Sequence, residues 1–509
     1  MSTDPTIDLQ KRITLLESEI TSLKNQNTDL TSKLLMTKET LEIYKQRLFG
    51  AKTERFTEDT PSLFNEAELE VETPEENEPP ETTTVTYERD KKPGRKPLPS
   101  DLPRIDKVID LTPEQKADLE VSGTLIKIGE EISEKLEIIP QQVHVLKIIR
   151  YKYALKSADG FSTVITANDS TPHIIPHGIA TASSLAYVLS SKFVDGLPYY
   201  RQETIFERLG IELSRQTMSN WQIYLYNNYL VRLIDLMKAD LTNSYCIGAD
   251  ETSLTVIQKD GQILDGKGYM WVYRGYQDNR TIQLFDYQAN RRGENPDNYL
   301  EGYSGYLQTD GYAGYNAVVD SGGLTHMACW AHVRRKFMDV NKDKYNASDA
   351  SRKIVRLIGK LYDVERVIRE KKLYPGAAYA LRLKDSEPVL NEIHEWLIAN
   401  QAKYPPSLNM GKAINYALNQ WSGLTVYLQD ARLHIDNNLV EGAIRPFVIG
   451  RKNWLFAYSP KGATSSAALY SLVETAKCNG REPYAYLREL FEKLPAAQND
   501  EDYRKLLPY

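Results

Sequence analysis

Residues 434–454 read HIDNNLVEGAIRPFVIGRKNW, and this stretch is the most informative part of the chain. It places a carboxylate, Glu441, one helical turn before Arg445, and a short predicted loop then leads to Arg451 and Lys452. Carboxylates bind divalent metal ions, whereas arginine and lysine bind phosphate oxygens. The stretch therefore predicts a metal ligand beside groups that hold phosphate.

Two earlier segments place further carboxylates at the ends of predicted strands. Residues 245–252 (YCIGADET) and 305–312 (GYLQTDGY) are short apolar, β-prone runs that end around Asp250 and Asp310. Together with Glu441 they form a set of hard oxygen donors, which suits Mg²⁺ or Mn²⁺ better than zinc. Two such ions can clamp the attacking and leaving oxygens of a phosphoryl transfer.

Each of these carboxylates, taken alone, is better interpreted as a helix cap or a solvated loop residue. Glu251 and Asp436 lie beside the predicted ligands and are just as acidic, but they fall outside the predicted set. Only the combination of the three positions predicts a metal site.

Several motifs along the chain occur in one order. They are LFGAKTER (48–55), KFVDGLPYYRQ (192–202), GADET (248–252), TDGY (309–312), CWAHVRRKF (329–337) and the stretch around Glu441. Over nearly the whole chain, their order and spacing resemble those of the large transposase of the insertion-sequence-66 family, a bacterial DDE transposase.

The resemblance implies a multidomain α/β protein in which Asp250, Asp310 and Glu441 form the catalytic triad of an RNase H-like core. That core is expected at 244–480, with a mostly helical insertion at about 340–430 and a C-terminal tail at 481–509. From the residue chemistry alone, the conclusion stops at a divalent-metal phosphoryl-transfer enzyme.

The expected function is cleavage and strand transfer at the ends of an insertion sequence, with two Mg²⁺ or Mn²⁺ ions. The expected partners are double-stranded DNA of the terminal inverted repeats and of the target, further copies of the chain, and helper proteins that the element encodes. Two alternatives are a metal-dependent nuclease without strand transfer and a transposase-derived DNA-binding regulator. A regulator would tolerate loss of a carboxylate, whereas all three are present.

Composition limits the class of protein. The 509 residues are 41% hydrophobic and 26% charged, which is enough for several domains with their own cores. No apolar run approaches the roughly 20 residues of a membrane span, and no secretion signal is evident, so a cytoplasmic, nucleoid-associated protein is expected. The three cysteines lie far apart, which predicts neither a disulfide framework nor a zinc site. The net charge of −6 is an average over unlike parts, because residues 57–90 hold twelve acidic residues against one arginine.

The segment 7–50 predicts a coiled coil that dimerises the protein. Apolar residues alternate in steps of three and four, and Asn27 occupies a core position of the type that fixes register. A long helix that packs on its own chain is the alternative. The heptad residues are Leu9, Ile13, Leu16, Ile20, Leu23, Asn27, Leu30, Leu34, Leu41, Tyr44 and Leu48.

The segment 57–99 predicts a disordered acidic linker that ends in a basic hook. The hook, KKPGRKP at 91–97, is of the kind that enters a DNA minor groove, and its alternative is a solvated, charge-balancing tail. Its candidate DNA contacts are Lys91, Lys92, Arg95 and Lys96.

A small β-rich module is expected at 105–169, with alternating runs at 137–145 and 148–153. Many relatives carry zinc-binding cysteine pairs in this region. Here the corresponding positions, around 120–123 and 154–159, contain no cysteine, so we expect this module to fold without zinc.

A helical DNA-binding region is expected at 175–235. The segment 200–221 is typical of a helix, a glycine-bearing turn and a serine-capped second helix, the helix-turn-helix pattern. The second helix would present Arg215, Gln216 and Asn220 to a groove. The alternative is a two-helix corner without DNA.

Strands are expected at 245–257, 269–276 and 281–287, followed by helices at 351–371, 377–383 and 387–398. Arg334, Arg335 and Lys336 are candidate phosphate contacts or a solvated face. Cys329 and His332 are interpreted as a buried pair without metal, because two ligands do not make a tetrahedral site. The aromatic residues Trp454, Phe456 and Tyr458 are expected in a core strand.

Overall fold

The computed structural model describes residues 143–156, 162–166, 173–176, 178–257, 268–277, 280–315, 318–319, 323–340 and 349–509, with isolated positions before residue 143. The chain forms two compact units, one of residues 1–74 and 170–509 and the other of residues 75–169. The expected linker and basic hook at 57–99 lie outside the described residues, as does most of the expected coiled coil. Both stay predictions.

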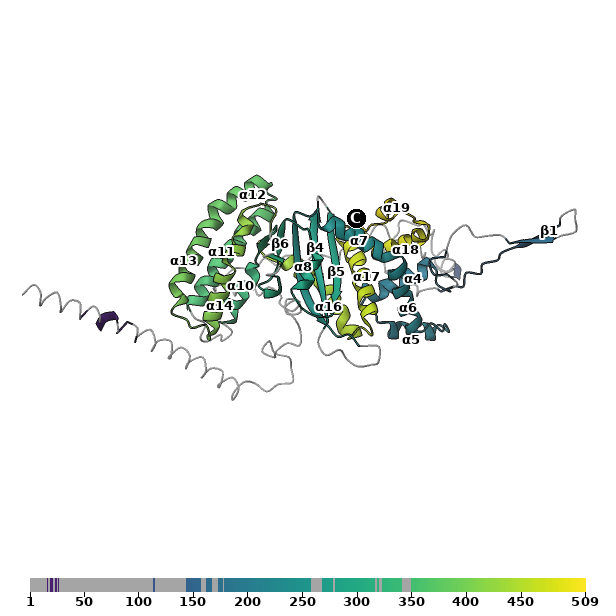
Figure 1. Cartoon of the computed structure of the whole chain (residues 1–509), viewed down its shortest axis with the longest axis horizontal. Helices are drawn as coiled ribbons and strands as arrows, with labels where there is room; N and C mark the ends of the chain where they lie inside the picture. Colours follow the sequence, from purple (N-terminus) through teal and green to yellow (C-terminus); the bar gives the residue numbers. More distant parts are fainter. Residues whose placement is uncertain are drawn as a thin grey trace, which may run out of the picture. The chain divides into compact units, whose positions relative to one another are not determined.

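Among the described residues of the larger unit, five strands form one sheet in the order β5-β4-β3-β6-β7, called the central sheet below (Figure 1). The first three strands are antiparallel, whereas β6 and β7 run parallel to β3. The strands predicted at 245–257, 269–276 and 281–287 are therefore confirmed. Their bounds are β3 Cys246–Leu254, β4 Gly268–Gln277, β5 Arg280–Gln288, β6 Tyr306–Gln308 and β7 Thr325–Met327.

The register of β3 determines where the carboxylates lie. Strand β6 pairs with only the first part of β3, and its last residue, Gln308, lies opposite Gly248. The chain leaves β6 at that level, two residues before Asp310, while β3 continues through Asp250 beside Val272 of β4. Parallel strands have their carboxyl ends at the same edge of a sheet. The two aspartates are consequently delivered to neighbouring places.

Helix α17 (Pro460–Cys478) closes the free edge of β5 with side-chain hydrogen bonds. Side chains spaced four residues apart on the helix and its C-cap accept hydrogen bonds from alternate backbone N–H groups of the strand. The pairs are Ser471 with Phe285 (2.7 Å), Thr475 with Gln283 (3.0 Å) and Asn479 with Thr281 (3.2 Å). Four helical residues rise about 6 Å and two strand residues about 6.8 Å, so the two periods match. An edge covered in this way offers no template for pairing with another chain.

The helices before the sheet share its hydrophobic core. Thr181 and Ser184 form a capping box at the first of them, and Ser214 caps the third by accepting from the N–H of Thr217 at 3.1 Å. The second and third helices confirm the predicted helix, turn and serine-capped helix. The bounds are α4 Ala182–Phe193, α5 Tyr199–Arg208, α6 Arg215–Leu225, η2 Tyr226–Leu230 and α7 Val231–Leu241.

Most of the helices between β7 and α16 (Asn438–Trp454) form a bundle with a second core around Trp330, Phe337 and Leu361 (Figure 1). The helices predicted at 351–371, 377–383 and 387–398 are confirmed. The bounds are α10 Trp330–Asp339, α11 Asp349–Glu370, α12 Pro375–Leu381, η4 Arg382–Ser386, α13 Glu387–Gln401, α14 Asn409–Asn419, α15 Trp421–Leu424 and η5 Val426–Leu428, while α8 Glu294–Tyr299 and η3 Ala313–Tyr315 precede β7.

The C-terminal segment differs from expectation. Residues 481–509 were expected as a tail, but they form α18 (Pro483–Lys493), η6 (Leu494–Ala496) and α19 (Asp500–Arg504). Tyr486 and Phe491 are buried in the core that the sheet shares with the first helices. Their apolar side chains make this segment part of the folded unit.

In the smaller unit, β1 (Lys152–Lys156) and β2 (Ser162–Thr166) form an antiparallel hairpin. The strand expected at 148–153 begins only at Lys152, and residues 143–151 are exposed and have no regular structure. The prediction from alternating apolar residues therefore placed this strand too early in the chain.

Among the described helices of the chain, none has both the length and the apolar character of a membrane span.

Candidate active site

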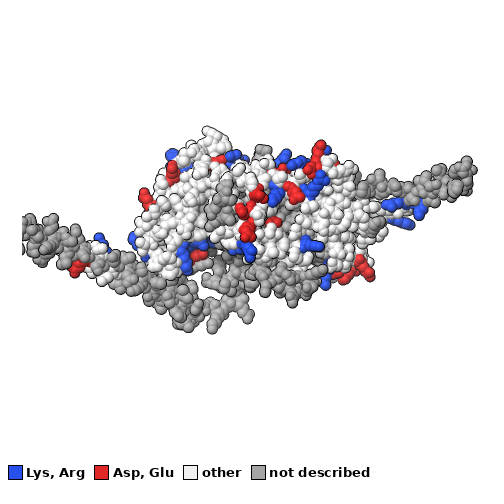
Figure 2. Space-filling model, in the orientation of Figure 1, with Lys and Arg blue, Asp and Glu red and all other residues white. Residues whose placement is uncertain are grey.

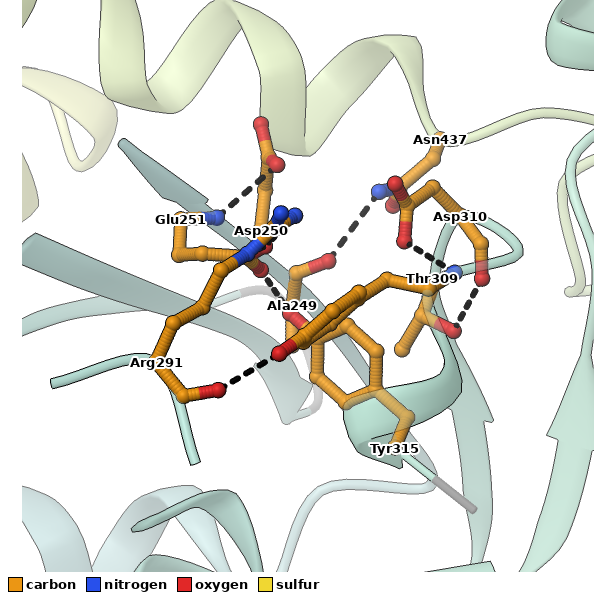
Figure 3. A network of polar contacts seen from close by, with 9 residues as sticks. Ala249, Asp250, Glu251, Arg291, Thr309, Asp310, Tyr315 and Asn437 are labelled. Atoms are coloured by element: carbon orange, nitrogen blue, oxygen red, sulfur yellow. Dashed lines mark hydrogen bonds and ion pairs between the residues drawn. The ribbon is translucent and has the colours of Figure 1, made fainter. Parts of the chain in front are cut away.

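Asp250 and Asp310 lie close enough for their charges to interact. Burial raises the pKa of Asp250 well above its ordinary value, and the negative charges of Glu251, Asp310 and Glu441 raise it further. Both aspartates are held by backbone N–H groups: Glu251 N donates to Asp250 Oδ1 at 2.8 Å, and Tyr312 N donates to Asp310 Oδ1 at 2.9 Å (Figure 3). The two carboxylates thus have fixed orientations and repel each other.

Glu441 reaches this place from the first turn of α16. The helix starts against β3: Asn437, its N-cap, donates its amide N–H to the carbonyl of Ala249 at 3.2 Å (Figure 3). Gly248 allows the close approach, because a Cβ there would collide with Val440. A glycine in the central strand and an asparagine at the helix start therefore position the third carboxylate, whose side chain is 3% exposed.

Two residues of α10 lie against Glu441. His332 Nδ1 is 3.6 Å from Glu441 Oε1, and an amino nitrogen of Arg335 is 3.8 Å from Oε2. Arg335 was a candidate phosphate contact, but its side chain is directed to the carboxylate. The other two candidates on this helix are exposed: Arg334 lies 5.9 Å from the ring centre of Tyr362, and Lys336 lies 4.6 Å from that of Tyr416.

The two neighbouring acidic residues have different surroundings. Glu251 accepts hydrogen bonds from Arg291 Nε at 2.7 Å and from the Tyr315 hydroxyl at 2.7 Å (Figure 3). Asp436 accepts from the backbone N–H and the amide of Asn438 at the start of α16. Glu251 thus has a guanidinium and a hydroxyl as donors from two other segments, which favours a structural role for it.

The basic residues after Glu441 lie on α16 itself. The loop predicted between Arg445 and Arg451 is wrong, because the helix continues through Pro446 to Trp454. Arg451 donates to the Thr252 hydroxyl at 2.9 Å and to the carbonyl of Ser253, so it ties the helix to the end of β3. Arg445 is partly buried and Lys452 is exposed.

The aromatic residues that follow do not form a core strand. Trp454 ends the helix, and Phe456 and Tyr458 are 44% and 63% exposed. Among the described residues, a single β-bridge, between Ala457 and Val256, joins this segment to the chain just after β3. The prediction of a buried strand relied only on the apolar character of these side chains, and Phe456 and Tyr458 are exposed instead.

The predicted recognition residues lie in the first half of α6. Arg215 is 3.9 Å from Glu203 of α5, and the amide of Gln216 donates to Asn220 at 2.9 Å. All three predicted side chains are exposed. The other candidates, Lys91, Lys92, Arg95 and Lys96, are outside the described residues.

Sequence reasoning missed several polar partners at the site. Arg291 and Tyr315 lie outside the motifs, and Asn437 lies inside the stretch around Glu441 without a predicted role. The partners of all three on β3 are distant in sequence. His326, whose Nε2 lies 2.9 Å from the Thr309 hydroxyl, is another such residue. Burial lowers the pKa of His326, and the nearby Asp310 opposes this.

Asp250 on β3, Asp310 after β6 and Glu441 on α16 are thus near enough for the charges of Asp310 and Glu441 to raise the pKa of Asp250. The family described as "Transposase IS66 family" matches residues 177–465, and the "IS66 C-terminal element" matches 471–509. The chain therefore belongs to the IS66 transposase family. Two further family descriptions match, "Transposase C of IS166 homeodomain" at 37–106 and "zinc-finger binding domain of transposase IS66" at 122–154, although the latter range contains no cysteine.

Similar proteins occur in Sinorhizobium fredii (strain NBRC 101917 / NGR234). The uncharacterized protein y4hP is 29% identical over 488 residues, which cover 89% of this chain and 85% of that protein. The uncharacterized protein y4qI is 32% identical over 437 residues, which cover 82% of this chain and 78% of that protein. The similarity therefore extends over most of the chain.

Proposed function

We propose that this chain is a DDE transposase that binds the ends of an insertion sequence and catalyses metal-dependent DNA cleavage and strand transfer. One observation carries the proposal. Asp250 lies on β3, Asp310 follows β6, and Glu441 lies at the start of α16. The negative charges of Asp310 and Glu441 nevertheless both raise the pKa of Asp250. The strand order and directions of the central sheet support an RNase H-like core around them.

The donor set fits Mg²⁺ or Mn²⁺. Three carboxylates offer hard oxygen ligands, and a divalent cation among them would offset both the burial and the like charges that raise the pKa of Asp250. Asp250, Asp310 and Glu441 are the assigned ligands of two ions. When bound, such ions lower the pKa of a water molecule and stabilise charge on the attacking and leaving oxygens.

The protein itself contributes orientation and charge. The N–H of Tyr312 fixes Asp310, Asn437 holds the start of α16 on β3, and His332 and Arg335 hold Glu441. A water molecule attacks the phosphodiester first, and the released 3′-hydroxyl then attacks target DNA. Both steps need correct positioning and no covalent intermediate on the protein.

The DNA contacts assigned in the larger unit are Arg215, Gln216 and Asn220 on α6, Arg334 on α10, and Arg445 and Lys452 on α16. On the face shown in Figure 2, basic side chains are interspersed with acidic ones over the described part. DNA would therefore be held by separate local contacts, and the hook at 91–97 would add to them. The coiled coil would bring two chains to paired ends.

The test uses single substitutions that keep size but remove charge. Asp250→Asn, Asp310→Asn and Glu441→Gln should each lower cleavage and strand transfer by more than about 100-fold, because each removes a ligand charge. Cleavage is measured on duplexes that carry the inverted repeats flanking the coding region. Binding to the same duplexes, measured by gel shift, should persist.

Glu251→Gln and Asp436→Asn are the matched controls, since each removes a neighbouring carboxylate that has protein partners. Both should keep more activity than the triad variants. A fully active Glu441→Gln protein would contradict the assignment. Cleavage without any strand transfer would favour the nuclease alternative, and wild-type binding without cleavage would favour the regulator.

A further inference from the structure

A second group of potential metal ligands shares Glu441. The Sγ of Cys329, a ring nitrogen of His332 and a carboxylate oxygen of Glu441 all lie within 4.8 Å of one another. The three residues are 1%, 6% and 2% exposed. We propose that they form a binding site for a zinc-type transition-metal ion. The effect of this ion on catalysis rests on the proposed function, whereas its binding does not.

The geometry suits a four-coordinate ion. Cys329 is the N-cap of α10 and His332 lies in its first turn, so both side chains project from the same end of the helix. In a tetrahedral zinc site with bonds of about 2.0–2.3 Å, ligand atoms lie about 3.3–3.7 Å apart. His332 Nδ1 and Glu441 Oε1 are already 3.6 Å apart. The remaining separations, which are at most 4.8 Å, need to shorten by at most about 1.5 Å.

Two of the three ligands, Cys329 and Glu441, lie at helix N-termini. The N-termini of α10 and α16 meet here: Asn437 N donates to Cys329 Sγ at 3.2 Å, and Trp330 N donates to the carbonyl of Ile435 at 3.2 Å. Helix N-termini stabilise thiolates and carboxylates. Arg335 lies near Oε2 of Glu441, so the ion would be bound through Oε1 on the side of His332.

The ligand types select the ion. Thiolate and imidazole bind Zn²⁺ or Co²⁺ in preference to Mg²⁺, which takes oxygen ligands. Three protein ligands leave a fourth position for water or another small ligand. A zinc-type ion that holds Glu441 on the α10 side would withdraw it from Asp250 and Asp310. Such ions would then inhibit Mg²⁺-supported cleavage.

The binding test uses the metal-free full chain and Co²⁺ as the probe. About one Co²⁺ per chain should give the near-ultraviolet thiolate-to-cobalt band and the intense visible bands of tetrahedral cobalt. Cys329→Ser should abolish the near-ultraviolet band, whereas the matched control Cys246→Ser, at another buried cysteine, should keep it. His332→Ala should weaken binding by about 10- to 100-fold. Absence of the band in the wild type, or its persistence in Cys329→Ser, would overturn the proposal.

Cleavage assays separate this proposal from the proposed function. Zn²⁺ at the concentration that displaces Co²⁺ should inhibit wild-type cleavage in excess Mg²⁺, and Cys329→Ser should resist that inhibition. Equal inhibition of both proteins would show that Zn²⁺ does not inhibit cleavage by binding Glu441 together with Cys329. If Glu441→Gln remains active, the proposed function fails, but the cobalt spectrum still decides whether the metal site exists.

Discussion

Asp250 and Glu251 are adjacent on β3, and burial raises the pKa of both, but Glu251 has a cationic partner in Arg291. Glu251 has Arg291 and Tyr315 as donors, whereas Asp250 is buried near the negative charges of Glu251, Asp310 and Glu441. Buried like charges without a cation disfavour ionisation. The ionised carboxylate of Asp250 should therefore destabilise the ion-free protein, although metal binding requires it.

Asp250→Asn should therefore stabilise the ion-free protein. The folded state raises the pKa of Asp250, so it binds more protons than the unfolded state once the pH exceeds the ordinary value of 3.8. Stability then falls as the pH rises through this window. In EDTA, the variant should have a higher thermal unfolding midpoint than the wild type at pH 7.5, and the difference should shrink toward pH 4.

Added Mg²⁺ supplies the control for this prediction. It should raise the unfolding midpoint of the wild type more than that of Asp250→Asn, because the ion replaces the missing positive charge only where the carboxylate is present. Equal midpoints for the two proteins in EDTA across the pH range would show that the ionised carboxylate of Asp250 does not destabilise the folded protein.

At the scale of elements, Arg382 links the helical bundle to the chain that leads into the site. It makes two 2.8 Å bonds to the carboxylate of Glu365 on α11 and donates to the carbonyls of Tyr427, Asp430 and Leu433. Its side chain is 3% exposed. These bonds fix the segment just before residues 434–441, where α16 begins.

Arg382→Met should destabilise the protein by about 3–5 kcal/mol, because it leaves the Glu365 carboxylate without a compensating charge. The double variant Arg382→Met/Glu365→Leu should recover part of this loss. Urea unfolding measures both. Arg366→Gln removes a solvent-exposed ion pair with Asp363 on the same helix and should change little. A loss in Arg366→Gln as large as in Arg382→Met would contradict this explanation.

At the scale of the whole molecule, assembly depends on the N-terminal heptads. The described residues Leu16, Ile20 and Leu23 of this segment are helical and 51%, 50% and 58% exposed. Apolar side chains along one helical seam favour burial against a second helix. This supports the coiled coil as a proposal.

A chain that starts at residue 57 should be monomeric, whereas the full chain should be a dimer. Light scattering measures the two masses directly. Replacing Leu16 and Leu23 with lysine in the full chain gives the matched variant, which should also become monomeric. Equal association of all three proteins would mean that another surface carries assembly.

The sequence by itself determined the elements whose signals are local. Strands around Asp250 and Asp310 and the serine-capped helix at Ser214 were predictable, because alternation and caps act over a few residues. The resemblance to the transposase family placed Glu441 in one predicted triad with Asp250 and Asp310.

Only the tertiary structure decided what depends on contacts between distant residues. Helix α16 continues through Pro446, although a proline removes one helical hydrogen bond, because Phe447 and Val448 are buried in the core. Arg335 and Cys329 meet Glu441 across about a hundred residues of chain, and the segment 481–509 packs where a tail was expected. Packing free energy is a property of the assembled core, so no local pattern contains it.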